Sequence, residues 1–166
     1  MTELPGRAGA TLGSSDPPRH DRLRALVQHA FMKRNLQALE EPIRAVAQQV
    51  FGQLRGVSQF DFKDVSSQFT VKVLMSALGL PMGEEALVAE HEVRDHAVLM
   101  VQSDARTRAK GPEHIAAYQW MQNYAAQVIA LRRAEPRNDL ISHFAMAEID
   151  GDRLDEREVL LTTTTL

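Results

Sequence analysis

Apolar residues recur every three or four positions along most of the chain, and this spacing places them on one face of an α-helix. The clearest stripe consists of Leu23, Leu26, Val27 and Ala30. No segment alternates between apolar and polar residues in the manner of a half-buried strand. The pattern therefore predicts an all-α fold from Asp16 onward.

Interruptions of the pattern indicate where the helices begin and end. Asp16 is the expected N-cap of the first helix and Pro17 its first residue, since proline needs no hydrogen-bond donor there. Pro42 should divide the second helix into a short segment and a longer one. The expected helices cover approximately 16–31, 34–55, 62–79, 84–103, 112–135 and 138–149, and a last one begins near residue 155.

The two ends of the sequence differ from the rest. Residues 1–15 are rich in Gly, Ser, Ala and Thr, and we expect a flexible lead-in to one helical domain over 16–166. The last helix opens with a capping-box pattern at Asp155 and Glu158, but it runs into four successive threonines without a stop signal. Because threonine is a poor helix former, this ending predicts a helix that is cut within its length and an incomplete chain.

Composition limits the chemistry that the chain can carry. Its 166 residues include no cysteine, which excludes disulfides, thiolate metal sites and cysteine nucleophiles. No apolar run is long enough for a membrane span and the N-terminus lacks a secretion signal, so we expect a cytoplasmic location. Residues 1–60 carry eight Lys and Arg against five Asp and Glu, whereas residues 61–166 carry eleven against seventeen. An acidic partner should therefore favour the front of the chain, and no basic patch indicates nucleic acid.

His20 and Arg24 are the candidate binding residues. They are four residues apart beside the apolar stripe of the first helix, so their side chains lie one above the other. A planar guanidinium binds a carboxylate through two hydrogen bonds and an imidazole can add a third, so the pair suits a buried carboxylate. The spacing also allows Arg24 to pair with a protein acid such as Asp21 or Glu40, while His20 is solvated.

No catalytic or metal-binding group is indicated elsewhere in the sequence. His91, Glu92, Asp95 and His96 are close together, but the two histidines are five residues apart rather than the four that one helix face requires. We expect a solvated helix face there.

The first helix also carries a family resemblance. Its sequence begins with Asp16-Pro17-Pro18-Arg19-His20-Asp21-Arg22-Leu23-Arg24 and continues with Leu26-Val27 and Ala30-Phe31. This segment resembles the C helix of bacterial cytochromes P450, whose usual pattern is D-P-P-x-H-x-x-x-R. Weaker blocks resemble later helices in the same order: Leu39-Glu40 and Ile43-Arg44, Phe60-Asp61-Phe62, Val71, Val73-Leu74 and Leu78-Gly79-Leu80-Pro81, then Asn138-Asp139-Leu140-Ile141-Ser142 and Asp150-Gly151-Asp152-Arg153-Leu154. The resemblance covers about 10–166, from the C helix to the early I helix, and the family's β-regions and haem-ligand loop have no counterpart in the sequence.

This resemblance implies a site and partners. His20 and Arg24 match the positions that bind the carboxylates of haem b. Arg19, Arg22, Lys33 and Arg34 would contact an acidic ferredoxin or flavodoxin, unless they form an ordinary solvated basic face. The family's activity implies O2, electrons from NAD(P)H and a small organic substrate. Its axial cysteine is not in this chain, so we expect the chain alone to be inactive. The alternative is a stand-alone or degenerate helical binding or regulatory module without haem.

Overall fold

The structure is a computed structural model, and it describes residues 9–102 and 109–165. These residues form eight α-helices: α1 (Arg19–Ala30), α2 (Lys33–Gln37), α3 (Glu40–Gly52), α4 (Phe62–Leu78), α5 (Glu90–Val101), α6 (Pro112–Ala134), α7 (Leu140–Met146) and α8 (Glu156–Thr165). Two 3-10 helices, η1 (Leu12–Ser14) and η2 (Gly83–Glu85), and a hairpin of β1 (Glu148–Ile149) and β2 (Asp152–Arg153) complete the described elements. The helical fold is confirmed, and the hairpin is the part that the apolar pattern did not predict.

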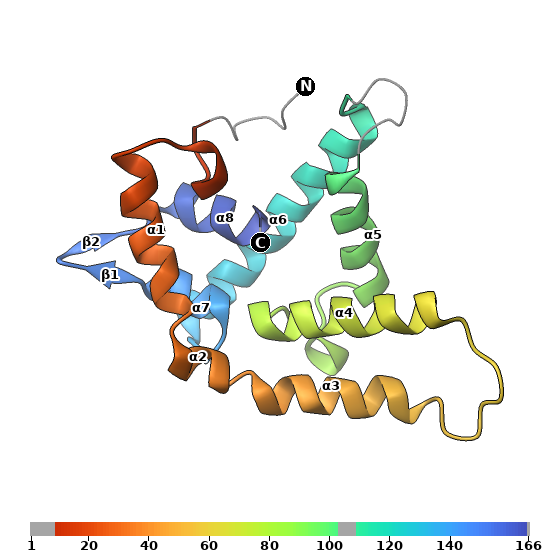
Figure 1. Cartoon of the computed structure of the whole chain (residues 1–166). Coiled ribbons are helices and arrows are strands. Elements are labelled where there is room, and N and C mark those ends of the chain that lie inside the picture. The colour runs from red at the N-terminus through yellow and green to blue at the C-terminus, as the bar shows by residue number, and fades with distance from the viewer. Residues whose placement is uncertain (1–8, 103–108, 166) are drawn as a thin grey trace.

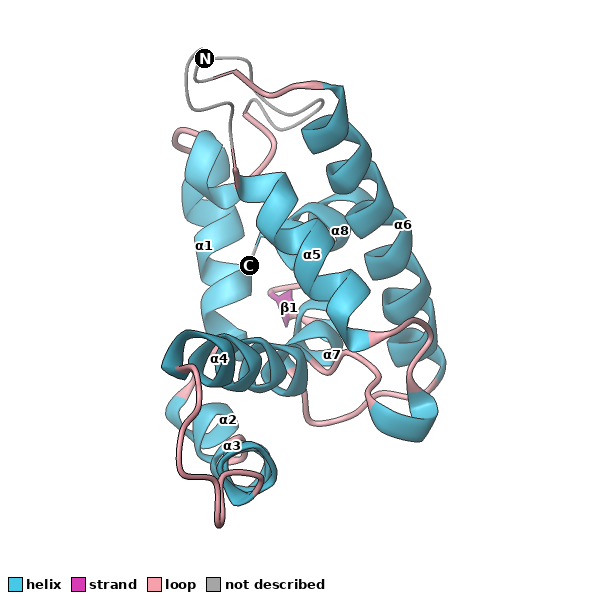
Figure 2. Cartoon of the chain, turned by 90° about the vertical axis from the view of Figure 1, so that its right-hand side faces the viewer, coloured by secondary structure: helices cyan, strands magenta, loops and turns pink. Residues whose placement is uncertain are grey.

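α3 and α4 lie along one side of the other helices (Figure 1), with α4 in contact with α7 and joined to α5 by the ion pair of Lys72 and Glu90. α6 packs against α5, α7 and α8, and α1 packs against α7. α3 and α4 run antiparallel and side by side, and Figure 2 shows them as a separate layer below α1, α5 and α6. None of the described helices is long and apolar enough to cross a membrane.

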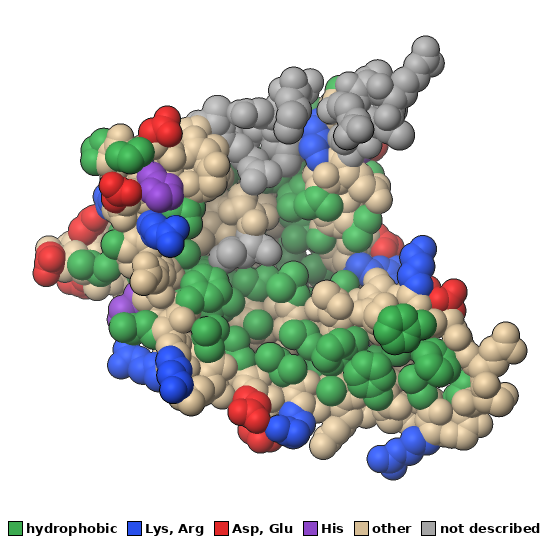
Figure 3. Space-filling model, in the orientation of Figure 1, with side chains coloured by type: hydrophobic (Ala, Val, Ile, Leu, Met, Phe, Trp, Pro, Cys, Tyr) green, Lys and Arg blue, Asp and Glu red, His purple; other side chains and the backbone are tan. Residues whose placement is uncertain are grey.

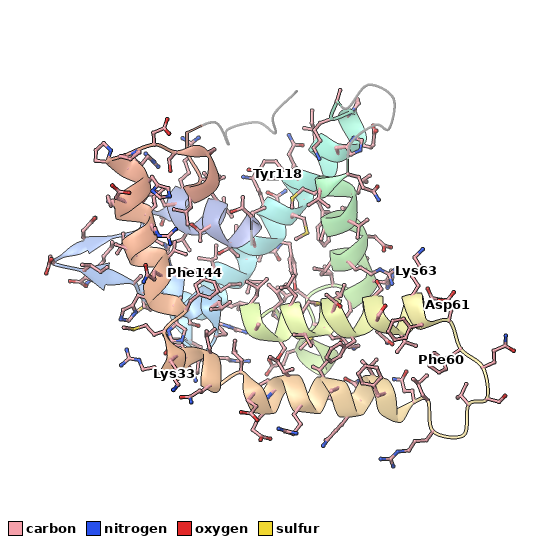
Figure 4. All side chains as sticks on the ribbon, in the orientation of Figure 1. Lys33, Phe60, Asp61, Lys63, Tyr118 and Phe144 are labelled. Atoms are coloured by element: carbon pink, nitrogen blue, oxygen red, sulfur yellow. The ribbon has the colours of Figure 1, made fainter. Side chains whose placement is uncertain are left out.

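The predicted stripe on α1 forms part of the core. Its four residues are all buried, and they belong to one cluster with Ile141 and Phe144 of α7 and Val159 of α8. Phe144 is completely buried and lies where α7 meets the end of α1 (Figure 4). The apolar periodicity therefore identified the face by which α1 attaches to the rest of the fold.

The start of α1 differs from the prediction. Asp16 is not an N-cap: the helix begins at Arg19, no side chain caps it, and the His20 N–H donates to the Asp16 carbonyl at 3.0 Å. Pro17 and Pro18 have no N–H, so the first helical hydrogen bonds must come from residues after them. Within the lead-in, Thr11 is buried and its hydroxyl lies 2.7 Å from that of Ser14, and the flexibility of 1–15 stays a prediction. Residues 1–8 lie outside the described residues.

Three other helix boundaries shift for local reasons. The break in the predicted second helix falls at 38–39, and Pro42 occupies the third position of α3, where an N–H would have no helical partner. α5 begins only at Glu90, after η2 and a bent connection over 86–89; residue 103 lies outside the described residues. α7 ends at Met146, before the hairpin turn, in which Asp150 and Gly151 have φ of 52° and 80°.

A buried ion pair replaces an expected apolar contact on α6. Leu131 lies three residues after the buried Val128 and continues the apolar spacing of α6, but it is 43% exposed, whereas Arg132 is 5% exposed. The Arg132 Nε donates to Asp139 Oδ2 at 2.6 Å, and the same guanidinium donates to the Gly79 carbonyl. Asp139 Oδ1 accepts the Ser142 N–H at 2.8 Å and so caps α7. The pair thus joins the end of α4 and the end of α6 to the start of α7.

Gly79 is required at this junction. It ends α4 with φ of 84°, a conformation that favours glycine. A Cβ atom at this position would lie 2.1 Å from Asp139 Oδ2. Even a methyl group would therefore displace the carboxylate that Arg132 binds.

Removal of Arg132 tests the importance of this junction. Arg132→Ala leaves Asp139 buried without a counter-charge, and breaking a buried pair in this way lowers the free energy of unfolding by about 3–5 kcal/mol. Arg133→Ala is the matched control, because the neighbouring Arg133 is partly exposed and pairs with the exposed Glu156. Urea unfolding followed by circular dichroism measures both, and equal losses in the two variants would contradict the assignment.

Candidate functional site

His20 and Arg24 lie on the first two turns of α1. The Arg24 side chain is exposed, and it has no ion pair or side-chain hydrogen bond within residues 9–102 and 109–165. The two acids that could have paired with it have other partners: Asp21 contacts His20, and Glu40 accepts from Arg44 at 2.9 Å. The alternative in which Arg24 pairs with Asp21 or Glu40 is therefore wrong for this structure, and its guanidinium is available to an anion.

His20 is less exposed and already has one contact. Its side chain is 31% exposed, and Nδ1 lies 3.0 Å from Asp21 Oδ1. If Nδ1 carries the proton that Asp21 accepts, Nε2 can donate to a second carboxylate only in the imidazolium form. In that form His20 can support Arg24 in binding an anion.

Arg22 faces a different part of the molecule. Its Nη1 donates to both carboxylate oxygens of Glu158, at 2.9 and 3.0 Å. Its Nε and Nη2 donate to Asp152 at 2.7 and 2.8 Å, and Nη2 also donates to the Arg153 carbonyl at 2.7 Å. Hydrogen bonds to Asp152 and Glu158 raise the pKa of Arg22, and the bond from Arg22 lowers the pKa of Asp152.

Arg19 shares the same acidic partner. Its Nη2 donates to Glu158 Oε1 at 3.1 Å, and its side chain is 46% exposed. Arg19 and Arg22 were both expected to form a basic surface for a partner. Because Glu158 and Asp152 neutralise them, these two arginines contribute little net positive charge to that surface.

The remaining basic residues of the expected surface are on α2. Lys33 and Arg34 are exposed and form no ion pair within the described part of the chain; Figure 4 labels Lys33 beside the end of α1. Nearby, the pKa of His143 is lowered, chiefly by burial and also by the electrostatic effect of the neighbouring basic residue Arg34. The positive character of this region therefore belongs to the α1–α2 corner rather than to the start of α1.

His96 of α5 packs on the aromatic rings of α6. No group of His, Cys, Asp and Glu that could hold a metal ion occurs among the residues that the structure describes. The His96 ring stacks on Trp120 of α6 with ring centroids 4.0 Å apart, and Trp120 stacks on Tyr124. These rings join α5 to α6.

An exposed apolar surface follows α3, α4 and the loop between them (Figure 3). Its most exposed side chains are Phe51, Val57, Phe60, Phe62 and Leu74, which are 43–70% exposed. A surface of this kind is typical of a contact with another polypeptide segment.

The two arginines of α1 should differ in their effect on stability. Arg22→Ala removes both hydrogen bonds to the buried Glu158 and should lower the free energy of unfolding by about 1–3 kcal/mol. Arg24→Ala, a matched change on the same helix, removes no described contact and should leave stability unchanged. Urea unfolding measures both variants; a larger loss for Arg24→Ala would contradict the division between them.

The Arg22–Asp152 pair predicts acid sensitivity. Because Arg22 lowers the pKa of Asp152 from its ordinary 3.8, the stabilisation is complete above pH 3.8 and is lost as the pH falls through the lower, folded-state value. Asp152→Asn should therefore be less stable than the wild type at pH 6, and the difference should shrink below pH 3.8. Urea midpoints measured across this range test it, and a difference that is independent of pH would contradict it.

The sequence and the fold were compared with those of known proteins. No family model matches the sequence. The chain is 33% identical over 165 residues to the cyclomarin C epoxidase CymV of Salinispora arenicola, covering 95% of this chain and 41% of the relative. It is 33% identical over 153 residues to the erythromycin C-12 hydroxylase of Saccharopolyspora erythraea, covering 91% of this chain and 37% of the relative.

Solved structures agree with these relatives. Cytochrome P450 CYP109Q5 from Chondromyces apiculatus superposes with a TM-score of 0.78 at 30% identity, over 99% of this chain and 39% of that chain. The Bacillus subtilis cytochrome P450 PksS superposes with a TM-score of 0.80 at 25% identity, over 95% of this chain and 39% of that one. The chain thus spans about two fifths of the length of the relatives that it matches. Its helices, its α1 motif and these relatives together place it in the bacterial cytochrome P450 family, as a partial cytochrome P450.

Proposed function

We propose that this chain is the helical part of a haem-thiolate monooxygenase, in which α1 binds the carboxylates of haem. Such an enzyme would oxidise a small organic substrate with O2 and electrons derived from NAD(P)H. The epoxidase and hydroxylase names of the relatives support oxygen insertion as the reaction class. They do not favour a helical regulatory module without haem.

The unpaired guanidinium of Arg24 carries the proposal. Three arginines lie within six residues of α1, and two of them, Arg19 and Arg22, pair with Glu158. Arg24 is exposed and donates no side-chain hydrogen bond to any residue that the structure describes, with His20 one turn away on the same side. A dicarboxylate such as haem fits these donors, since a guanidinium can bind one carboxylate through two hydrogen bonds and an imidazolium can bind another oxygen.

The residues of this chain fit only the carboxylate end of the cofactor. The sequence has no cysteine, so an axial thiolate would have to come from residues outside it. When bound through a thiolate, haem supplies the activation of O2. The contribution of this chain is to bind and orient the cofactor's carboxylates, and we assign it no catalytic residue.

An electron donor would dock at the α1–α2 corner. Lys33 and Arg34 are exposed there, and their charges are not neutralised by described acids. Charges of this kind steer an acidic ferredoxin or flavodoxin by long-range attraction. Of the four basic residues expected from the sequence, Lys33 and Arg34 are therefore the main contacts in the proposal, and Arg19 and Arg22 mainly serve the fold.

Binding of haem and of its dimethyl ester to the 166-residue chain tests the carboxylate site. The wild type should bind haem more tightly than the ester, because esterification removes the anions that Arg24 and His20 bind. Arg24→Gln should weaken haem binding about tenfold, as expected for a charge-assisted hydrogen bond, and should leave ester binding unchanged. Absorbance titration followed in the Soret band gives both dissociation constants.

Arg55→Gln is the matched control for that titration. Arg55 is also exposed and has no described ion pair, but it lies after α3, away from α1. It should bind both porphyrins like the wild type. Equal affinity of the wild type for haem and ester, or a histidine-ligated spectrum that Arg24→Gln does not change, would overturn the proposed function.

A further inference from the structure

Glu158 is a buried carboxylate that receives hydrogen bonds from α1. It is 4% exposed and lies in the first turn of α8. It accepts from Arg22 and from Arg19, and also from the Asp155 N–H at 3.1 Å. The neighbouring Glu156 is 88% exposed in its side chain and pairs with Arg133 of α6 instead. Glu158 is therefore distinguished among the acids of this turn by its burial and by its partners.

Capping alone does not account for these features. The Glu158 N–H donates to Asp155 Oδ1 at 2.8 Å, and the carboxylate accepts the Asp155 N–H, which is the reciprocal pattern of a capping box. Such a box functions equally well at an exposed helix end. Here the same carboxylate is enclosed and has two arginine partners 136 and 139 residues earlier in the sequence.

Arg22 completes the link between three elements. Its Nη1 bonds to α8 through Glu158, and its Nε and Nη2 bond to the hairpin through Asp152 and the Arg153 carbonyl. All three nitrogens of the guanidinium thus have acceptors in fixed directions. A planar fork bound on two edges resists rotation of its helix, whereas apolar packing has no such directional preference.

The rotation of α1 about its axis determines where the candidate site points. Successive residues of an α-helix are about 100° apart around the axis, so His20 and Arg24 each lie about 200° from Arg22 and about 40° from one another. Both therefore project from the side opposite Arg22. A change in the direction of Arg22 would turn both side chains by the same angle.

We propose that Glu158 and Arg22 are positioning residues that hold α1 in the rotation at which His20 and Arg24 face a bound carboxylate. The inference rests on the proposed function in one respect, which is that His20 and Arg24 bind a carboxylate. The orientation of α1 follows from the contacts of Arg22 and Glu158 and does not depend on that function. The surface acids Glu156 and Asp21 have no part in it.

The absence of cysteine allows a direct test of the orientation. Spin labels on cysteines introduced at Arg24 of α1 and Gln127 of α6 report the distance between these helices by double electron–electron resonance. The wild-type distance distribution should be narrow. Glu158→Gln, which removes the charge, and Arg22→Lys, which keeps the charge but loses the fork, should both broaden or shift it. Glu156→Gln is the matched control and should not.

A second label pair separates positioning from general loss of structure. Labels at His91 of α5 and Gln127 of α6 should give the same distance in all variants, because neither helix contacts Arg22 through the described bonds. If the α1 distance stays narrow in both Glu158→Gln and Arg22→Lys, or if both label pairs broaden equally, the inference is overturned.

Porphyrin binding distinguishes the two proposals. Glu158→Gln should lose the preference for haem over its dimethyl ester to the same extent as Arg24→Gln, about tenfold, whereas Glu156→Gln keeps it. A wild type without this preference overturns the carboxylate function, and the spin-label distances then decide the orientation alone. If the wild type prefers haem to the ester and Glu158→Gln shows the same preference, the positioning role is overturned.

Discussion

The buried pair of Arg132 and Asp139 is the interaction on which the packing of the helices depends. Removing two charges from water costs several kcal/mol for each ion, so such a pair persists only where its hydrogen bonds are satisfied. Here the guanidinium donates to Asp139 and to the Gly79 carbonyl, and Asp139 also accepts the Ser142 N–H. These bonds place the end of α4, the end of α6 and the start of α7 at one point. The close approach requires glycine at position 79.

Glu158 of α8 also joins helices through an arginine, since it binds Arg22 of α1. The two arginines differ in their exposure. Arg132 is buried with its partner, whereas Arg22 is 35% exposed and connects a buried acid to an exposed one. Water can enter on the Asp152 side, so the cost of desolvation is smaller there. The result is an anchor that fixes the direction of α1 without enclosing the whole helix, and the opposite side of α1 remains open to a ligand.

The arginines of α1 illustrate how a cationic helix can serve both the fold and a site. Arg19 and Arg22 are neutralised by acids from the end of the chain, and Arg24 has no described partner. The proposed carboxylate site on this helix therefore consists of Arg24 and His20. The chain corresponds to about two fifths of the length of its relatives and has no cysteine, and the proposed function accordingly assigns it only the binding of haem carboxylates.

The sequence by itself determined what depends on neighbours within one or two turns. Local sequence patterns predicted four features of the structure. These are the buried stripe of α1, the end of α4 at Gly79, the capping box of Asp155 and Glu158, and the common side of His20 and Arg24. The motif from Asp16 to Arg24 also indicated the family.

Only the tertiary structure decided which charges find partners. Arg22 and Arg24 are arginines of the same helix, yet the first meets Glu158 and Asp152 and the second meets no described acid. Leu131 and Arg132 exchange their expected environments because Asp139 and the Gly79 carbonyl lie beside Arg132. These partners are up to 136 residues away from the arginines they bind, and local periodicity carries no information about contacts over such separations.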